Sequence, residues 1–313
     1  MAYVGLQEQI DKNNRKSILL LIAFPVLLLL MVFMIAVVIN GDSPTFTDDF
    51  ISIIPFVFIG VVVWFLIAYL FNTQMINLTT HSETLTRKDN MRVYNLTENL
   101  CMSVGMTMPK LRIINSNGLN AFASGINEKS YTVTLTSGII ESLDDEELEG
   151  VIAHELTHIR NKDVRLLIIS IIFVGIFSYT MQIAFRALFN GGGSSRRNGK
   201  NDKGGKVYIL LAILAITALA YFFSFLFKMA LSRKREYLAD SGAVEMTKNP
   251  EGLARALEKI AKNSIISEVK NKDVQQMYIE HSSENSDDFF TGLNGIFATH
   301  PPIEKRIAFL RNI

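Results

Sequence analysis

The residues with the clearest chemical pattern are two histidines and a glutamate in the segment His154-Glu155-Leu156-Thr157-His158. Histidines four residues apart lie on one face of a helix, one turn apart, so His154 and His158 can each present an imidazole nitrogen to one Zn²⁺. Glu155 points to the side, where it can reach a water beside the metal. The chain has a single cysteine, Cys101, so a metal site here must use histidine and carboxylate.

A catalytic zinc site usually has three protein ligands and one open position, so the sequence must supply a third ligand. Glu236 and Asp240 are four residues apart and share a face if they are helical. Spacing alone does not choose between them, and it leaves Glu251 and Glu258 open as well. The plain alternative is a surface glutamate that pairs with a neighbouring Arg or Lys. If Glu236 is the ligand, Asp240 is placed to accept a hydrogen bond from a ligand imidazole.

These residues lie in two polar segments. One segment separates the second and third of four apolar blocks, and the other follows the fourth block. The blocks cover about residues 18–39, 51–71, 166–189 and 207–231, and each reaches the roughly 20 residues that a membrane-spanning helix needs. A mean hydropathy of +0.25 with only 19% charged residues argues against an ordinary soluble enzyme. A cleaved signal peptide is the alternative for the first block, and a pair of buried soluble helices for the last two. The length of the blocks favours retained membrane helices.

The distribution of charge predicts the orientation in the membrane. A basic N-terminal arm precedes the first block, and the link at 40–50 is acidic without Lys or Arg. The positive-inside tendency therefore puts the N-terminus and the polar segments in the cytoplasm. The basic link at 196–206 conflicts with a crossing hairpin, and a hairpin that does not fully cross would resolve the conflict. A net charge of +1 gives no indication of a nucleic-acid partner.

We therefore predict a mainly α membrane protein with four transmembrane helices and a cytoplasmic α+β zincin-like catalytic domain. In this domain a small β-sheet lies beside the helix that carries His154 and His158. Short strands are expected at 111–114, 120–123 and 131–135, and the histidine helix should begin near Asp144. The predicted regions are 1–71 (arm and first two membrane helices), 72–165 (first catalytic part), 166–231 (membrane hairpin with a basic, Gly- and Ser-rich loop) and 232–313 (second catalytic part).

Four motifs in order resemble a known family. They are Asn120-Ala121-Phe122-Ala123-Ser124-Gly125, H-E-L-T-H-x-x-N-x-D at 154–163, R-E-x-x-A-D at 235–240, and His300-Pro301-Pro302 with Arg306. Together they resemble the HtpX membrane zinc metalloproteases, bacterial relatives of the prenyl-protein (CAAX) endopeptidases. The resemblance implies that His154, His158 and Glu236 bind zinc and that Glu155 is the general base and acid. It also implies that Asp240 supports a ligand histidine.

Other residues receive roles when the resemblance is combined with the chemistry of peptide hydrolysis. His300 is a candidate donor to the negative charge of the tetrahedral intermediate, the alternative being a loop histidine before two prolines. Arg306 is expected to anchor the C-terminal helix by an ion pair. Asn120, Ala121, Phe122 and Ala123 are expected to form an extended edge beside the site, to which a substrate peptide adds as a strand. The alternative is an interior strand with Phe122 in the core.

The expected function is that of an integral membrane zinc endopeptidase in the bacterial cell membrane, with its catalytic domain facing the cytoplasm. The metal would activate a water, and Glu155 would take its proton and pass it to the leaving amine. The expected partners are the lipid bilayer and polypeptide substrates, which the resemblance implies are damaged, misfolded or unassembled membrane proteins. The alternatives are a prenyl-protein-type processing protease and a non-catalytic scaffold. The scaffold's structural zinc site should be closed by four ligands.

Overall fold

The computed structural model describes residues 6–40, 44–169, 214–219, 221–222, 233–262 and 301–313, and the single positions 172, 179, 182 and 186. The chain divides into two compact units. The first comprises Met1–Arg15, Phe71–Ile168 and Met229–Ile313, and the second comprises Lys16–Leu70 and Ile169–Lys228. Every predicted site residue that the structure describes lies in the first unit.

The second unit contains the apolar parts of two long helices, α1 (Leu6–Asn40) and α2 (Phe46–Thr80). Phe33 of α1 packs edge-on against Phe50 of α2, with ring centroids 5.1 Å apart. The stretch Phe46–Phe71 of α2 is long and apolar enough to cross a membrane, whereas the apolar run Ile22–Met34 of α1 is shorter. Large apolar side chains on α2 are exposed, Phe56 by 75%.

Four membrane helices were predicted, and within the described residues one stretch has the length and composition of a span. Most of the predicted hairpin at 166–231, including its basic loop at 196–206, lies outside the described residues. His300 also lies outside them.

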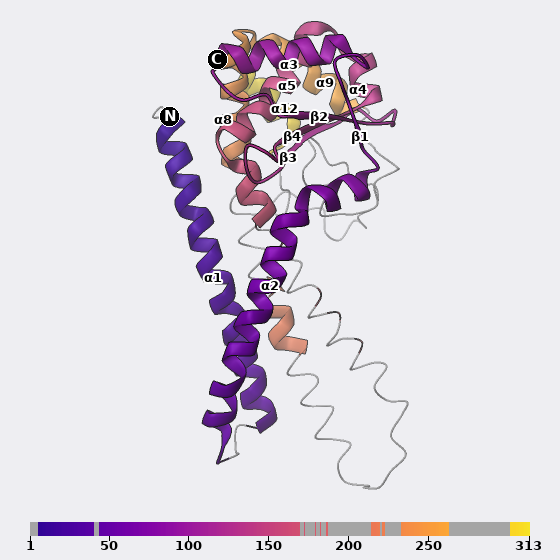
Figure 1. Cartoon of the computed structure of the whole chain (residues 1–313). Helices are drawn as coiled ribbons and strands as arrows, with labels where there is room; N and C mark the ends of the chain where they lie inside the picture. The colour runs from indigo at the N-terminus through magenta and orange to yellow at the C-terminus, as the bar shows by residue number, and fades with distance from the viewer. Residues whose placement is uncertain are drawn as a thin grey trace. The chain divides into compact units, whose positions relative to one another are not determined.

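The first unit contains a four-stranded sheet with the order β1-β2-β4-β3 (Figure 1). The strands are β1 (Glu83–Thr84), β2 (Lys110–Ile114), β3 (Ala121–Ser124) and β4 (Thr132–Thr136). β2 runs parallel to β4, and the other two pairs are antiparallel. The last three strands match the predicted strands to within a residue. Every residue of β4 is buried, so its β-branched threonines and valine suit a strand covered on both faces.

Apart from the ends of α1 and α2, six helices of the first unit are described. They are α3 (Met91–Ser103), α4 (Ser137–Ser142), α5 (Asp145–Arg160), α8 (Arg233–Thr247), α9 (Pro250–Lys262) and α12 (Ile303–Leu310). α5 is central, because it packs against α8, α9, α3 and β3. It begins one residue after Asp144, because Asp144 is its N-cap and forms a capping box with Glu147.

Two glycines let the neighbouring helices approach α5 closely. A Cβ on Gly242 of α8 would lie 2.8 Å from Oγ1 of Thr157 on α5, and nearer still to its Cγ2. A Cβ on Gly150 of α5 would lie 2.9 Å from the backbone nitrogen of Leu253 on α9. The absence of a side chain at these two positions therefore sets how closely α8 and α9 lie against the histidine helix.

Candidate metal centre

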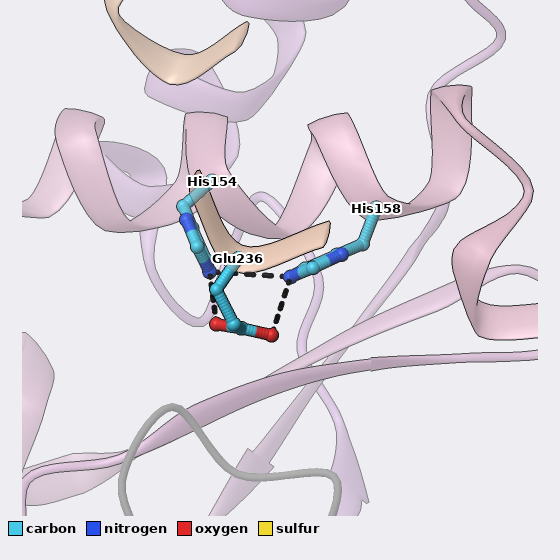
Figure 2. Close-up of side chains that lie close together, drawn as sticks. All are labelled: His154, His158 and Glu236. Carbon is cyan, nitrogen blue, oxygen red and sulfur yellow. Dashed lines mark hydrogen bonds and ion pairs between the residues drawn. The ribbon is translucent and has the colours of Figure 1, made fainter. Parts of the chain in front are cut away.

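Two helices bring the three expected ligands together (Figure 2). His154 and His158 lie one turn apart on α5, and their Nε2 atoms are 3.2 Å apart. Glu236, in the first turn of α8, faces both, with Oε2 3.6 Å from Nε2 of His154 and Oε1 3.7 Å from Nε2 of His158. Ligand atoms of all three residues lie within 4.8 Å of one another. Of the four carboxylates that spacing left open as the third ligand, Glu236 is the one that lies within reach of both histidines.

The spacing of these atoms fits a zinc ion. Ligand atoms bound tetrahedrally at about 2.0–2.2 Å from zinc are roughly 3.3–3.6 Å from one another. The three observed separations of 3.2, 3.6 and 3.7 Å lie close to this range. Two imidazole nitrogens and a carboxylate are also a donor set that zinc prefers. The other two carboxylates left open, Glu251 and Glu258, pair with Arg311 at the surface instead.

The nitrogen of His154 that points away from Glu236 contacts a buried ion pair. Its Nδ1 lies 3.0 Å from Oδ1 of Asp240 on α8. Arg306 of α12 donates two hydrogen bonds to the same carboxylate, at 2.9 and 2.6 Å, and its Nη1 lies 3.4 Å from Glu236. The expected ion pair of Arg306 is therefore present, and its partners are residues of the metal centre itself.

The charges around the site shift the pKa values of its residues. Burial lowers the pKa of His154, and so does Arg306, but hydrogen bonds to Asp240 and Glu236 outweigh both and raise it to about 9. Burial raises the pKa of Asp240, yet the Arg306 guanidinium and His154 bring it below its ordinary value. The buried carboxylates thus favour positive charge between them, which a metal cation can supply in place of the proton on His154.

Glu155 contacts the edge strand of the sheet. It is buried, and burial raises the pKa of its carboxyl, while the backbone N–H of Ala123 donates a hydrogen bond to it. The N–H of Thr136 on β4 donates to the carbonyl of Asn120, so backbone groups two residues further along, at Phe122, face β4 as well. Those of Ala121 and Ala123 face the outer edge, which explains how the Ala123 N–H reaches Glu155.

The expected substrate-binding segment forms β3, which lies at the edge of the described sheet but is buried. Asn120, Ala121 and Phe122 are each 1% exposed and Ala123 is 5% exposed. Both outward N–H groups have partners within the chain, Ala121 with the side chain of Asn120 and Ala123 with Glu155. Phe122 therefore lies in the core, as the alternative interpretation required, while the strand still borders Glu155.

Known proteins resemble the chain over almost its whole length. The model of peptidase family M48 matches residues 87–313. The chain belongs to peptidase family M48. The Protease HtpX homolog of Bacteroides fragilis is 52% identical over 99% of both chains, and that of Lactobacillus acidophilus is 34% identical over 98% of this chain and 100% of its own. The expectation of an HtpX-type metalloprotease is confirmed.

A solved structure has a similar fold. The crystal structure of S. mikatae Ste24p matches 97% of this chain with a TM-score of 0.51 and 20% sequence identity. This chain spans 66% of the length of that protein. At this identity the likeness concerns the fold, which is mostly helical, and not the substrate.

One residue of this M48 peptidase that sequence reasoning missed lies at the end of the histidine helix. Oδ2 of Asp163 is 3.2 Å from Nδ1 of His158. Asp163 is the last letter of the H-E-L-T-H-x-x-N-x-D motif, but it follows the helix, so helical spacing assigned it no position. Cys101 is buried, and burial raises the pKa of its thiol to about 11, so it is apolar filling rather than a nucleophile.

Proposed function

We propose that this chain is an integral membrane, zinc-dependent endopeptidase that hydrolyses peptide bonds in damaged, misfolded or unassembled membrane proteins. The proposal places its catalytic domain, built from 72–165 and 232–313, at the cytoplasmic face of a bacterial cell membrane. The observation that carries the catalytic part is the convergence of His154, His158 and Glu236 beside the buried Glu155. The apolar, exposed stretch of α2 supports attachment to the membrane.

In this proposal His154, His158 and Glu236 hold the zinc ion, which when bound lowers the pKa of water and polarises a peptide carbonyl. The His158 side chain is 15% exposed and that of His154 is 1% exposed, so solvent reaches the ligand set from the His158 side. Asp240 and Arg306 hold the imidazole of His154 with Nδ1 toward Asp240 and Nε2 toward Glu236. This orientation leaves a nitrogen lone pair for the metal.

Glu155 is the proposed general base and acid. It takes a proton from the attacking water and returns it to the nitrogen of the leaving amine. The backbone N–H of Ala123 fixes the position of the carboxyl that accepts and releases this proton. His300 is proposed to donate to the oxygen that becomes negative during attack.

The substrate peptide is proposed to align along β3. The outward N–H of Ala123 bonds to Glu155, so a peptide lying along β3 would bring its carbonyl close to the base. Because the outward N–H groups have internal partners, the carbonyls of Ala121 and Ala123 are the groups proposed to accept hydrogen bonds from the substrate. Recognition through backbone would allow many sequences to bind.

A matched pair of variants on α5 tests the proposal. We expect the full chain, purified in detergent, to cleave an unfolded protein such as casein and to lose this activity with a zinc chelator. Glu155→Gln should lower cleavage by about 10²–10⁴-fold and retain its zinc, because only the proton transfer is lost. Glu149→Gln, on the same helix but half-exposed, should cleave like the wild type. Undiminished cleavage by Glu155→Gln would contradict the role given to Glu155.

A second experiment tests the topology. A reporter in the loop at 196–206 should be accessible from outside the cytoplasm if the 166–231 hairpin crosses the membrane. Reporters at the N-terminus and after Ile313 should both be cytoplasmic. A cytoplasmic signal from the 196–206 loop would overturn the four-helix arrangement.

A further inference from the structure

The two histidines of the metal centre are supported in the same manner. Nδ1 of His154 faces Asp240, whose carboxylate is bonded to the buried Arg306. Nδ1 of His158 faces Asp163, which in turn contacts the buried Arg235. Each imidazole thus has a carboxylate on one nitrogen, while the other nitrogen faces Glu236.

An uncommon backbone conformation brings Asp163 back toward the helix it follows. α5 ends at Arg160, and Asn161 is its C-cap. Lys162 then adopts a left-handed conformation with φ of 58°, which few residues other than glycine take up, and its N–H bonds to the carbonyl of Ile159. After this turn Asp163 is buried, and its carboxylate lies within hydrogen-bond distance of His158.

The same helix that supplies the third ligand also contacts Asp163. Nη1 of Arg235 donates to the backbone carbonyl of Asp163 at 3.4 Å and lies 3.8 Å from its Oδ1. Arg235 directly precedes Glu236 in α8. A small movement of the first turn of α8 would therefore displace Glu236 and, through Arg235, also the Asp163 carboxylate that contacts His158.

We propose that Asp163 is a positioning residue for His158 and that Arg235 holds Asp163 in place. With its proton on Nδ1, His158 donates to Asp163, and the lone pair on Nε2 is then directed at the space between His154 and Glu236. This inference rests on the proposed zinc site. The rival interpretation is that Asp163 and Arg235 form an ion pair that only stabilises the fold.

Zinc affinity of the full chain in detergent separates the two interpretations, because a purely structural ion pair would not change it. The measurements are competition with a chromophoric chelator and the visible absorption of the Co²⁺-substituted protein. Asp163→Ala should weaken zinc binding by about 10–100-fold and alter the Co²⁺ spectrum. Asp163→Asn keeps an acceptor oxygen, so its affinity should lie closer to the wild type than to Asp163→Ala. Arg235→Ala should weaken binding too, and should add little to Asp163→Ala in the double variant.

Glu147→Ala is the matched control. Glu147 is buried, caps the opposite end of α5 and pairs with Lys259, so its removal destabilises the same helix without touching either histidine. It should lower the melting temperature and leave the zinc affinity unchanged. Zinc binding by Asp163→Ala at wild-type affinity would overturn the inference, as would an equal loss in Glu147→Ala. If the wild type binds no zinc, the proposed function itself fails. If the wild type binds zinc, His154→Ala loses it and Asp163→Ala keeps it, the proposed function stands and only this inference fails.

Discussion

Replacing Gly242 with alanine tests whether the close approach of α8 to α5 positions the metal ligands. The added Cβ would lie 2.8 Å from Oγ1 of Thr157 and nearer to its Cγ2. Thr157 is buried and its hydroxyl donates to the carbonyl of Ala153 at 2.8 Å, so it has little room to turn away. α8 must then move from α5, and Glu236 must move with it.

The size of the effect follows from two opposing contributions. Overpacking of a buried contact costs about 1–3 kcal/mol. Alanine is favoured over glycine inside a helix by up to ~1 kcal/mol, and Gly242 lies within α8. The expected net loss is up to about 2 kcal/mol, which corresponds to a fall of up to about 8 °C in melting temperature for a unit of this size.

Thermal unfolding of the full chain in detergent, together with zinc titration, measures both consequences. Gly242→Ala should melt at a lower temperature and bind zinc more weakly. Thr157→Ala removes both Oγ1 and Cγ2, so the double variant should regain the affinity and melt close to the Thr157→Ala variant. If the single variant Gly242→Ala melted at a higher temperature than the wild type, the helix propensity of alanine would outweigh the clash with Thr157. This result would refute the claim that close packing at position 242 requires glycine.

Three other results are expected. Gly150→Ala should lower the melting temperature more than Gly242→Ala, because its Cβ would meet the backbone of Leu253, which no side-chain substitution can relieve. Arg306→Ala should destabilise the protein by about 3–5 kcal/mol in thermal unfolding, since it leaves the Asp240 carboxylate buried without its cation; an exposed substitution such as Arg87→Ala should change little. The pKa of His154 near 9 in the metal-free site means that zinc must displace a proton, so zinc affinity should rise about tenfold per pH unit from pH 7 and level off above about pH 9; an affinity that falls over this range would contradict the sign.

The local features of the site could be predicted from the sequence because short-range rules govern them. The i, i+4 spacing of His154 and His158 fixes a shared helix face, and Asp144 with Glu147 fixes the start of that helix. The concentration of β-branched residues at 132–136 indicates a strand that the structure contains. These features depend on backbone periodicity, which a sequence carries directly.

The remaining features depend on contacts between distant segments or on unusual backbone. Glu236 becomes the facing carboxylate because α8 packs on α5, and this packing requires the glycine at 242. Arg306 pairs with Asp240 across 66 positions of sequence. Asp163 reaches His158 after a turn in which Lys162 adopts a left-handed conformation, and a lysine in the sequence does not predict this conformation. Helical spacing contains no information on any of these.

The most direct test of the central account is the zinc content of the purified full chain. Wild type and Glu155→Gln should each contain about one zinc per chain, because Glu155 is not a ligand. His158→Ala and Glu236→Gln should each lose most of it, because each removes one of the three atoms that converge at the site. A wild-type protein without zinc, or a Glu236→Gln variant that keeps one zinc per chain with unchanged affinity, would contradict the account.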